Sequence, residues 1–373
     1  MTHDVVIVGG GLVGCLSAWA LAKTGASVAL IERTAIGAGA SSAAAGILGA
    51  QVEPHADSPA ARLGLASRAL YPALVDELRE LTGLPVPLTW PGTMRAWATD
   101  DEQTASTEAL RAYESLAWQR DAGHRVELLD WRALTEREPA LRHSCRAAIA
   151  FPDDGLTDPV VLLAAVERAL VAAGVRTHVG HAVVRVDAEA GRARGVTLDD
   201  GTSLSADHVV SCAGAWTSLL EGIPETVRRI RPIRGQMIEL ELSPPPTRSI
   251  VFGAGGYVVP RDDGRIVLGS TLEDIGFHDR TTAEGLHGVL SRALALVPEL
   301  KLASWRRAWA GLRPASADYV PVIGPTPIER LWVASGHFRG GILLAPITAA
   351  AVAALVRGTD PPFPLAAFSP CGP

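Results

Sequence analysis

Near the N-terminus, three glycines and one acidic residue have the spacing of a dinucleotide-binding site. Gly9, Gly11 and Gly14 form a G-x-G-x-x-G pattern, and Glu32 follows about 20 residues later. In such a site the first glycine permits a sharp turn, the second lets a pyrophosphate approach backbone N–H groups, and the third lets a helix pack closely on a strand. The acid suits the hydroxyl groups of a ribose. The alternative is an ordinary glycine-rich loop inside a buried β-α-β unit.

The residues around this pattern predict the elements that would position it. An apolar run at 5–8 predicts a buried strand that leads into Gly9. Apolar residues at helical spacing from Leu12 to Leu21 predict a helix, and the apolar run at 27–31 predicts a second strand. Strand, turn, helix, strand and acid agree with one another, which favours the nucleotide site over the ordinary loop.

A segment made almost entirely of small residues follows at 33–54. This composition predicts neither an amphipathic helix nor a patterned strand, so we expect a backbone that lies close to a flat or charged group. Ser41 and Ser42 are candidate hydroxyl donors to phosphate oxygens. The alternative is a flexible glycine-alanine linker.

Two later parts of the chain predict the remaining architecture. The apolar run at 209–212 leads into a small-residue turn at Gly214, which repeats the pattern of the N-terminal strand and predicts a return to the same sheet. Alternating residues and one helical pattern then predict an antiparallel sheet with a helix, as in a separate substrate domain. These segments are 231–242, 256–260, 265–271 and the helix at 282–296.

Composition bounds the class of protein. The chain has 373 residues, 48% of them hydrophobic, which is enough to bury a large core in about two or three domains. Its net charge of −6, without a basic stripe, argues against a nucleic-acid partner. The apolar run at 342–356 is too short to span a bilayer and contains Pro346, so we expect a soluble protein without a membrane segment.

The cysteines indicate the redox setting. They are scattered without C-x-x-C or paired spacing, so we expect neither a metal site nor a disulfide framework, and a reducing cytoplasm as the natural location. The four positions are Cys15, Cys145, Cys212 and Cys371.

Five segments together resemble FAD-dependent glycine oxidases of the D-amino acid oxidase superfamily. They are SAAAGILGAQVE at 42–53, GYVVPR at 256–261, GSTLEDIGF at 269–277, AGLRP at 310–314 and GHFRGGILLAP at 336–346. The resemblance spans residues 5 to about 357 and is most specific at the C-terminal end. It implies a mixed α/β and α+β fold, in which a Rossmann-like FAD-binding domain, discontinuous in sequence, carries an antiparallel-sheet substrate domain. The expected ranges are 1–85, 145–222 and 310–373 for the FAD-binding domain, and 86–144 and 223–309 for the substrate-binding domain.

The resemblance implies an extended, noncovalent FAD. Its ribose would lie on Glu32, its pyrophosphate against Leu12, Val13, Ala40 and Ser41, its flavin beside segments 45–47 and 337–343, and its adenine near Val183. The glycine-rich loop at 336–341 precedes an apolar helix, so N–H groups and the positive end of the helix dipole would face the flavin pyrimidine oxygen. For His337 in this loop, the alternative to direct work at the flavin is a structural role. The implied cofactor residues are Gly9, Gly11, Leu12, Val13, Gly14, Glu32, Arg33, Ala40, Ser41, Ser42, Ala45, Gly46, Ile47, Val183, Gly214, His337, Phe338, Arg339, Gly340, Gly341, Ile342 and Leu343.

The resemblance also implies a substrate site. The family binds the substrate carboxylate with an arginine and a tyrosine, which correspond to Arg313 and Tyr257. A guanidinium can bind a carboxylate through two parallel hydrogen bonds and so fix the α-carbon against the flavin. Arg339 and Glu53 would lie at the cleft, where they would shape substrate entry. For Tyr257 the alternative is an ordinary core aromatic residue.

The implied reaction is the oxidative deamination of glycine or another small amino acid, such as sarcosine or a small D-amino acid. Hydride transfer from the α-carbon to the flavin would give an imine, which hydrolyses to a 2-oxo acid and ammonia, with oxygen as acceptor and peroxide as product. Sarcosine oxidases are disfavoured because 305–341 contains no cysteine for a flavin tether and neither lysine, Lys23 nor Lys301, lies in a candidate flavin strand. A link to thiazole formation for thiamine is also implied. Two alternative functions stay open: a dehydrogenase with a quinone or protein acceptor, and a flavin-binding subunit without turnover. The preferred substrate and the possible formation of a homo-oligomer also stay open.

Overall fold

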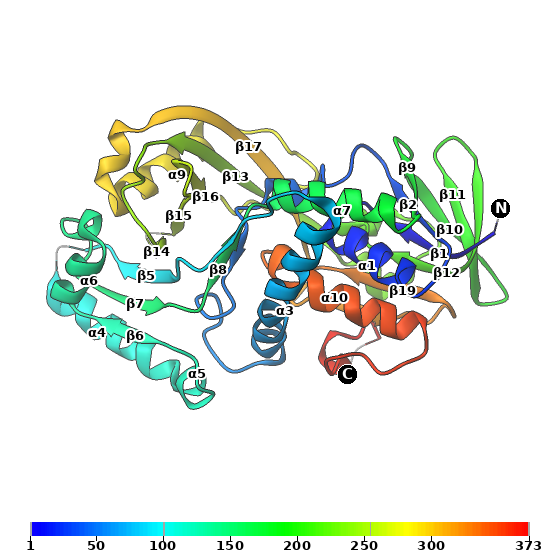
Figure 1. Cartoon of the computed structure of the whole chain (residues 1–373), viewed down its shortest axis with the longest axis horizontal. Coiled ribbons are helices and arrows are strands. Elements are labelled where there is room, and N and C mark those ends of the chain that lie inside the picture. The colour runs from blue at the N-terminus through cyan, green and yellow to red at the C-terminus, as the bar shows by residue number, and fades with distance from the viewer. Residues whose placement is uncertain (1, 100, 254, 372–373) are drawn as a thin grey trace.

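The computed structural model describes residues 2–99, 101–253 and 255–371, which form two lobes (Figure 1). The first lobe, at the right of Figure 1, contains a sheet with the order β10-β11-β12-β1-β2-β9, and β19 extends it by pairing with β12 and β18. Its strands are β1 (Thr2–Val8), β2 (Val28–Glu32), β9 (Arg176–Val179), β10 (Val183–Glu189), β11 (Arg192–Leu198), β12 (Ser203–Ser211), β18 (Val322–Pro325) and β19 (Leu331–Ser335).

The central strands of this sheet are covered on both faces. In β1, Val5 and Ile7 belong to one buried apolar cluster, whereas Val6 and Val8 belong to another on the opposite face. A strand buried on both faces has a continuous apolar sequence instead of an alternating one, which explains the run at 5–8. The strands β1, β2 and β12 pair in parallel, so the predicted return of 209–212 to the N-terminal sheet is confirmed.

Helices cover the face to which Val5 and Ile7 point. Helix α1 contacts α7 and α10, and α3 contacts both α7 and α10, so that these four helices form one layer (Figure 1). The helices of this lobe are α1 (Leu12–Ala22), α2 (Ala40–Ala43), α3 (Pro59–Thr82), α7 (Pro159–Ala172), α8 (Glu225–Arg228) and α10 (Gly341–Val356). No helix in the described ranges has both the length and the apolar character needed to cross a membrane.

The second lobe contains a sheet with the order β17-β13-β16-β15-β14-β5-β7-β6. Its strands are β5 (Thr93–Trp97), β6 (Glu127–Leu129), β7 (Ala147–Phe151), β13 (Arg231–Glu241), β14 (Ile250–Gly253), β15 (Gly256–Pro260), β16 (Arg265–Gly269) and β17 (Ser304–Ala315). Its helices are α4 (Glu102–Ser115), α5 (Ala117–Asp121), α6 (Trp131–Arg137) and α9 (Ala283–Leu296). Pairing within this sheet is antiparallel except between β14 and β5, so the predicted antiparallel sheet with a helix is present.

Short elements join the lobes. The strands β3 (Ile47–Leu48), β4 (Leu88–Thr89) and β8 (Gly155–Thr157) form a small third sheet, and 3-10 helices occur at Pro139–Leu141, Gly214–Leu219, Pro298–Leu302 and Ala366–Phe368. The domain ranges expected from the sequence remain a prediction. A division of the chain by sheet differs from them at two boundaries, because β7 pairs in the second sheet and β17 extends across residue 310.

Candidate functional site

A cavity of about 890 Å³ lies where the first sheet, the second sheet and the start of α10 meet. We call it the central cavity. Its volume lies within the range of small-molecule and cofactor sites, about 300 to 1,000 Å³. The first lobe contributes residues 31–34, 43–47, 181–184, 212–216 and 337–344, and the second sheet contributes Tyr257 and Arg313. Residues far apart in the sequence therefore share one wall.

The turn before α1 has the geometry that the glycine pattern predicts. Gly9 has φ +106°, and a Cβ there would lie 2.5 Å from the carbonyl oxygen of Cys212. A Cβ at Gly14 would lie 2.0 Å from the carbonyl oxygen of Gly9, so only glycine lets the helix approach the strand this closely. The Leu12 N–H donates to Ser41 Oγ at 2.9 Å, and the helix starts without a cap from its own N-cap residue. Its first turn can therefore hold an anion.

Glu32 lies on the cavity wall beside this turn. Its Oε2 accepts the N–H of Gly10 at 2.8 Å, and its Oε1 accepts the N–H of Thr34 at 2.9 Å. The next residue, Arg33, places its guanidinium 3.7 Å from the ring centre of Trp216, which also lines the cavity. The sequence reasoning missed Trp216, although it lies two residues after the small-residue turn at 213–214.

The small-residue segment at 43–47 is held by side chains of the second lobe. Trp309 Nε1 donates to the carbonyl oxygen of Ala43 at 3.0 Å, and Arg261 Nη2 donates to that of Ala45 at 2.9 Å. The backbone of this segment lines the central cavity. The linker alternative is therefore wrong, because small residues here let the backbone lie close to both lobes.

The start of α10 is fixed by α3. Pro346 has no N–H, so the carbonyl oxygen of Ile342 has no helical donor, and the hydroxyl of Tyr71 donates to it instead. The hydroxyl of Ser67 donates to the carbonyl oxygen of Leu343 at 2.6 Å. No side chain caps the first turn of α10, whose residues line the cavity. The positive end of its dipole is thus available to a negatively charged group.

His337 has the character of a structural residue. It is buried, and its Nε2 lies 3.1 Å from Thr348 Oγ1. Burial lowers the pKa of His337 to about 4, so the ring is neutral at physiological pH. The next residue, Phe338, donates its N–H to the carbonyl oxygen of Pro314 at 2.7 Å, which ties the loop to β17 beside Arg313.

Arg313 is a cation held by neutral hydrogen-bond acceptors. Its Nη2 donates to Ser270 Oγ at 2.7 Å and its Nη1 to the carbonyl oxygen of Thr271 at 3.2 Å. A Cβ at Gly235 would lie 2.1 Å from Nη2, so the guanidinium lies against the backbone of β13. Among the residues that the structure describes, none forms an ion pair with Arg313. Burial lowers the pKa of Arg313, and neighbouring Tyr257 partly offsets this change.

Tyr257 lies beside Arg313 on the cavity wall. Its hydroxyl donates to Met237 Sδ at 3.2 Å, a weak acceptor, and the ring packs against Gly269, where a Cβ would lie 2.4 Å from the hydroxyl oxygen. A second cation, Arg339, also lines the cavity, but its Nη2 contacts Glu53 Oε1 at 2.7 Å. At this part of the cavity, Arg313 thus offers a guanidinium without an ion pair among the described residues, beside the weakly engaged hydroxyl of Tyr257, and together they are the donor set for a carboxylate.

The structure brings most of the predicted cofactor residues together at the central cavity. Two of them do not line it. Gly14 packs beneath the turn, as its helix-packing role requires, and Ser42 donates its N–H to Gly37 at 3.1 Å while neighbouring Ser41 lines the wall. Sequence reasoning also missed the hydroxyl of Ser270, which fixes Arg313. The sequence signal for Ser270 was its place in the segment 269–277, one of those that carry the family resemblance.

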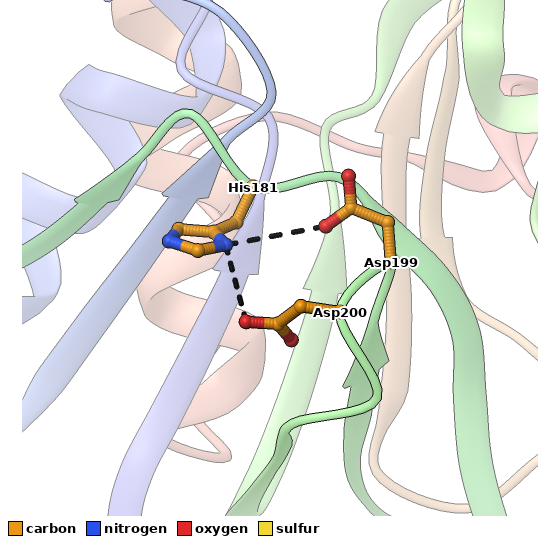
Figure 2. Close-up of side chains that lie close together, drawn as sticks. All are labelled: His181, Asp199 and Asp200. Carbon is orange, nitrogen blue, oxygen red and sulfur yellow. Dashed lines mark ion pairs between the residues drawn. The ribbon is translucent and has the colours of Figure 1, made fainter.

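Three exposed side chains lie close together at the adenine end predicted for the cavity. His181 Nδ1 is 3.5 Å from Asp200 Oδ2 and 4.0 Å from Asp199 Oδ1 (Figure 2). Their side chains are between 41% and 48% exposed, and Asp199 also accepts the N–H of Ala182 at 3.1 Å. Backbone and ion-pair contacts account for this cluster, and the expectation that the protein has no metal stays a prediction.

These features fit FAD. The uncapped starts of α1 and α10 suit a pyrophosphate and a flavin oxygen, the Glu32 carboxylate suits a ribose, and the fixed small-residue backbone suits a flat ring. Cys212 lines the cavity, and because burial raises the pKa of its thiol to about 12, it stays an unreactive thiol.

Comparison with known proteins agrees with this geometry. A family model described as FAD dependent oxidoreductase matches residues 4–355. The chain is 37% identical to a glycine oxidase of Geobacillus kaustophilus over 99% of this chain and 97% of that protein. The crystal structure of glycine oxidase from Geobacillus kaustophilus has a TM-score of 0.91, at 35% identity, and covers 99% of this chain and 98% of that one. A bifunctional protein ThiO/ThiG of Nostoc sp. is 33% identical over 97% of this chain, which spans 54% of that protein.

Proposed function

The chain belongs to the family of FAD dependent oxidoreductases, and from this premise we propose that it oxidises glycine or another small amino acid. The amine is converted to an imine, which water hydrolyses to a 2-oxo acid and ammonia. The single observation that carries the substrate class is the unpaired guanidinium of Arg313 beside the hydroxyl of Tyr257 on the central cavity wall.

The residues of the central cavity divide into a cofactor part and a substrate part. In this proposal the first turn of α1 and Ser41 hold the pyrophosphate, Glu32 holds the ribose, and the segment 45–47 with the start of α10 holds the flavin. When bound, FAD supplies the acceptor for the hydride that leaves the substrate. Among the described residues, the cysteine on the wall is Cys212, and its unreactive thiol supports noncovalent binding.

Arg313 and Tyr257 bind and orient the substrate. The guanidinium binds the carboxylate through two hydrogen bonds, and the tyrosine hydroxyl exchanges its weak contact with Met237 for a carboxylate oxygen. Ser270 and the backbone of β13 hold the guanidinium in place, so the α-carbon is presented in one orientation. Partial burial strengthens this pairing because water is excluded around the two charges.

The proposal includes molecular oxygen as acceptor, with peroxide as product, a cytoplasmic setting and a role in thiazole formation for thiamine.

One observation favours a second candidate, an amino acid dehydrogenase with a quinone or protein acceptor. Neither lysine lines the central cavity: Lys23 pairs with Glu77 at 2.8 Å, and Lys301 is exposed on the 3-10 helix Pro298–Leu302.

Anaerobic reduction of the bound flavin tests the proposal. The purified holoenzyme is mixed without oxygen with glycine, sarcosine, D-proline or D-alanine, and the flavin absorbance is followed before air is admitted. Loss of absorbance with at least one amino acid, and rapid recovery in air, is expected of the oxidase. Slow recovery in air would favour the dehydrogenase, and an unchanged spectrum with every amino acid would contradict both.

A further inference from the structure

A buried polar cluster outside the central cavity holds the segment that carries Glu53. Its centre is Asp154, which is fully buried in the turn between β7 and β8. Asp154 Oδ1 accepts the N–H of Gln51 at 3.1 Å and Arg68 Nη1 at 2.7 Å. Asp154 Oδ2 accepts the N–H of Val52 at 3.1 Å and Thr93 Oγ1 at 2.8 Å. Each carboxylate oxygen thus binds one backbone N–H and one side chain.

The side chain of Gln51 extends this cluster. Its Nε2 donates to Gln119 Oε1 at 3.2 Å and to the carbonyl oxygen of Arg125 at 3.0 Å. Gln119 Nε2 in turn donates to the carbonyl oxygen of Gln51 at 2.9 Å. We call Gln51, Arg68, Thr93, Gln119 and Asp154 the Asp154 cluster. Because these side chains come from α3, α5, β5 and the β7–β8 turn, the backbone at 51–52 is fixed from several directions.

Glu53 follows directly and lies on the cavity wall, where it pairs with Arg339. Arg339 is close enough to Arg313 for its charge to contribute to the lowered pKa of that guanidinium, and the charge of Glu53 acts in the opposite direction. Two cations therefore share this part of the cavity. Of these two, Arg339 pairs with Glu53, whereas Arg313 has no carboxylate partner among the described residues.

We propose that Asp154 is a positioning residue that keeps Glu53 paired with Arg339, so that the substrate carboxylate binds at Arg313 alone. The inference rests on the proposed function and adds the device that selects one of two cations. Glu53 and Arg339 are 42% and 38% exposed at their side chains, and such pairs are weak because ordering two long side chains costs entropy. A fixed backbone at 51–52 reduces this cost.

Loss of the pair has a specific kinetic consequence. A free Arg339 gives the carboxylate a second position in which the α-carbon is not presented for oxidation. Such unproductive binding lowers kcat and KM by the same factor and leaves kcat/KM unchanged. An exposed pair is worth about 0.2 to 1 kcal/mol, so we expect both constants to fall by a factor of roughly 1.4 to 5.

Steady-state kinetics of the FAD-loaded full chain, with the amino acid that reduces the wild type best, test the inference. The variants are Asp154→Asn, Glu53→Gln and the double variant, with the milder Thr93→Val in case Asp154→Asn does not fold. Asp76→Asn is the matched control, because Asp76 is an exposed acid on α3, the helix that carries Arg68, and pairs with Arg79 away from the cluster. We expect equal decreases of kcat and KM in Asp154→Asn and Glu53→Gln, a smaller parallel decrease in Thr93→Val, and no change in Asp76→Asn.

The double variant separates positioning from general loosening. If Asp154 acts through Glu53, the double variant should match Glu53→Gln. A decrease of kcat/KM in Asp154→Asn and Thr93→Val, or full additivity in the double variant, would overturn the inference and leave the proposed function standing. An absence of flavin reduction in the wild type with every amino acid would instead overturn the proposed function, and this inference with it.

Discussion

At the scale of single residues, the Glu32 carboxylate joins the glycine turn to the cavity. It accepts the N–H groups of Gly10 and Thr34 and lies on the wall where a ribose would lie. The sequence spacing predicted this position, because the acid ends the strand adjacent to β1. The cation–π contact between Arg33 and Trp216 was not predictable, because residues so far apart in sequence carry no mutual signal.

Replacement of Glu32 should weaken the binding of FAD. Glu32→Ala removes a charge-assisted hydrogen bond worth about 1.5 to 3 kcal/mol, so the Kd of FAD should rise by roughly ten- to a hundredfold. Glu32→Gln, which keeps an acceptor for Gly10, should have a smaller effect. Titration of the apoprotein with FAD, followed by flavin fluorescence, measures both. An unchanged Kd in Glu32→Ala would place the ribose elsewhere.

At the scale of elements, the start of α10 depends on α3. Pro346 interrupts the helical hydrogen bonds, and Tyr71 and Ser67 donate to the carbonyl oxygens at the first turn. The sequence predicted an apolar helix after a glycine-rich loop, and it showed Pro346. It did not show that a tyrosine from another helix compensates for that proline, because such pairing depends on how the two helices pack.

Removal of the Tyr71 hydroxyl should leave the Ile342 carbonyl oxygen without a donor. Tyr71→Phe should therefore lower the free energy of unfolding by about 1 to 3 kcal/mol. The added change Pro346→Ala restores a backbone N–H at the helical position and should recover most of that loss. Urea unfolding of the wild type, both single variants and the double variant measures these values. Equal losses from Tyr71→Phe with and without Pro346→Ala would contradict this account of α10.

The loop before α10 should make stability depend on pH. His337 has a pKa of about 4 in the folded protein, below the ordinary value of 6.5. As the pH falls from 6.5 to 4, the unfolded chain binds the proton first, so the free energy of unfolding decreases by roughly 2 to 4 kcal/mol. The stabilisation that comes from the neutral ring of His337 is fully present above pH 6.5.

The variant His337→Asn isolates that contribution. The stability difference between wild type and His337→Asn, measured by urea unfolding with excess FAD, should decrease as the pH falls from 7 to 4.5. A constant difference for His337→Asn would mean that folding does not lower the pKa of His337.

At the scale of the whole molecule, the site exists because two lobes meet. The first sheet supplies the nucleotide turn, and the second supplies Arg313, Tyr257 and the side chains that fix 43–47. The β-α-β unit and the antiparallel sheet were predictable from local patterns, because periodicity and glycine spacing are local. The Asp154 cluster and the pairing of β7 with β5 were not, because they join segments separated by tens of residues.

The central claim is that Arg313 binds the carboxylate of an amino acid substrate. The test compares the anaerobic rate of flavin reduction by an amino acid with that by its decarboxylated amine, in wild type, Arg313→Ala and Arg313→Lys. Arg313→Ala should cost about 3 to 5 kcal/mol for the amino acid, roughly two to three and a half powers of ten in kcat/KM. Arg313→Lys should recover part of this, because an ammonium cannot supply the planar two-point contact, and the amine should change little in either variant. Equal losses for amino acid and amine would contradict the claim and remove Arg313 from the carboxylate site.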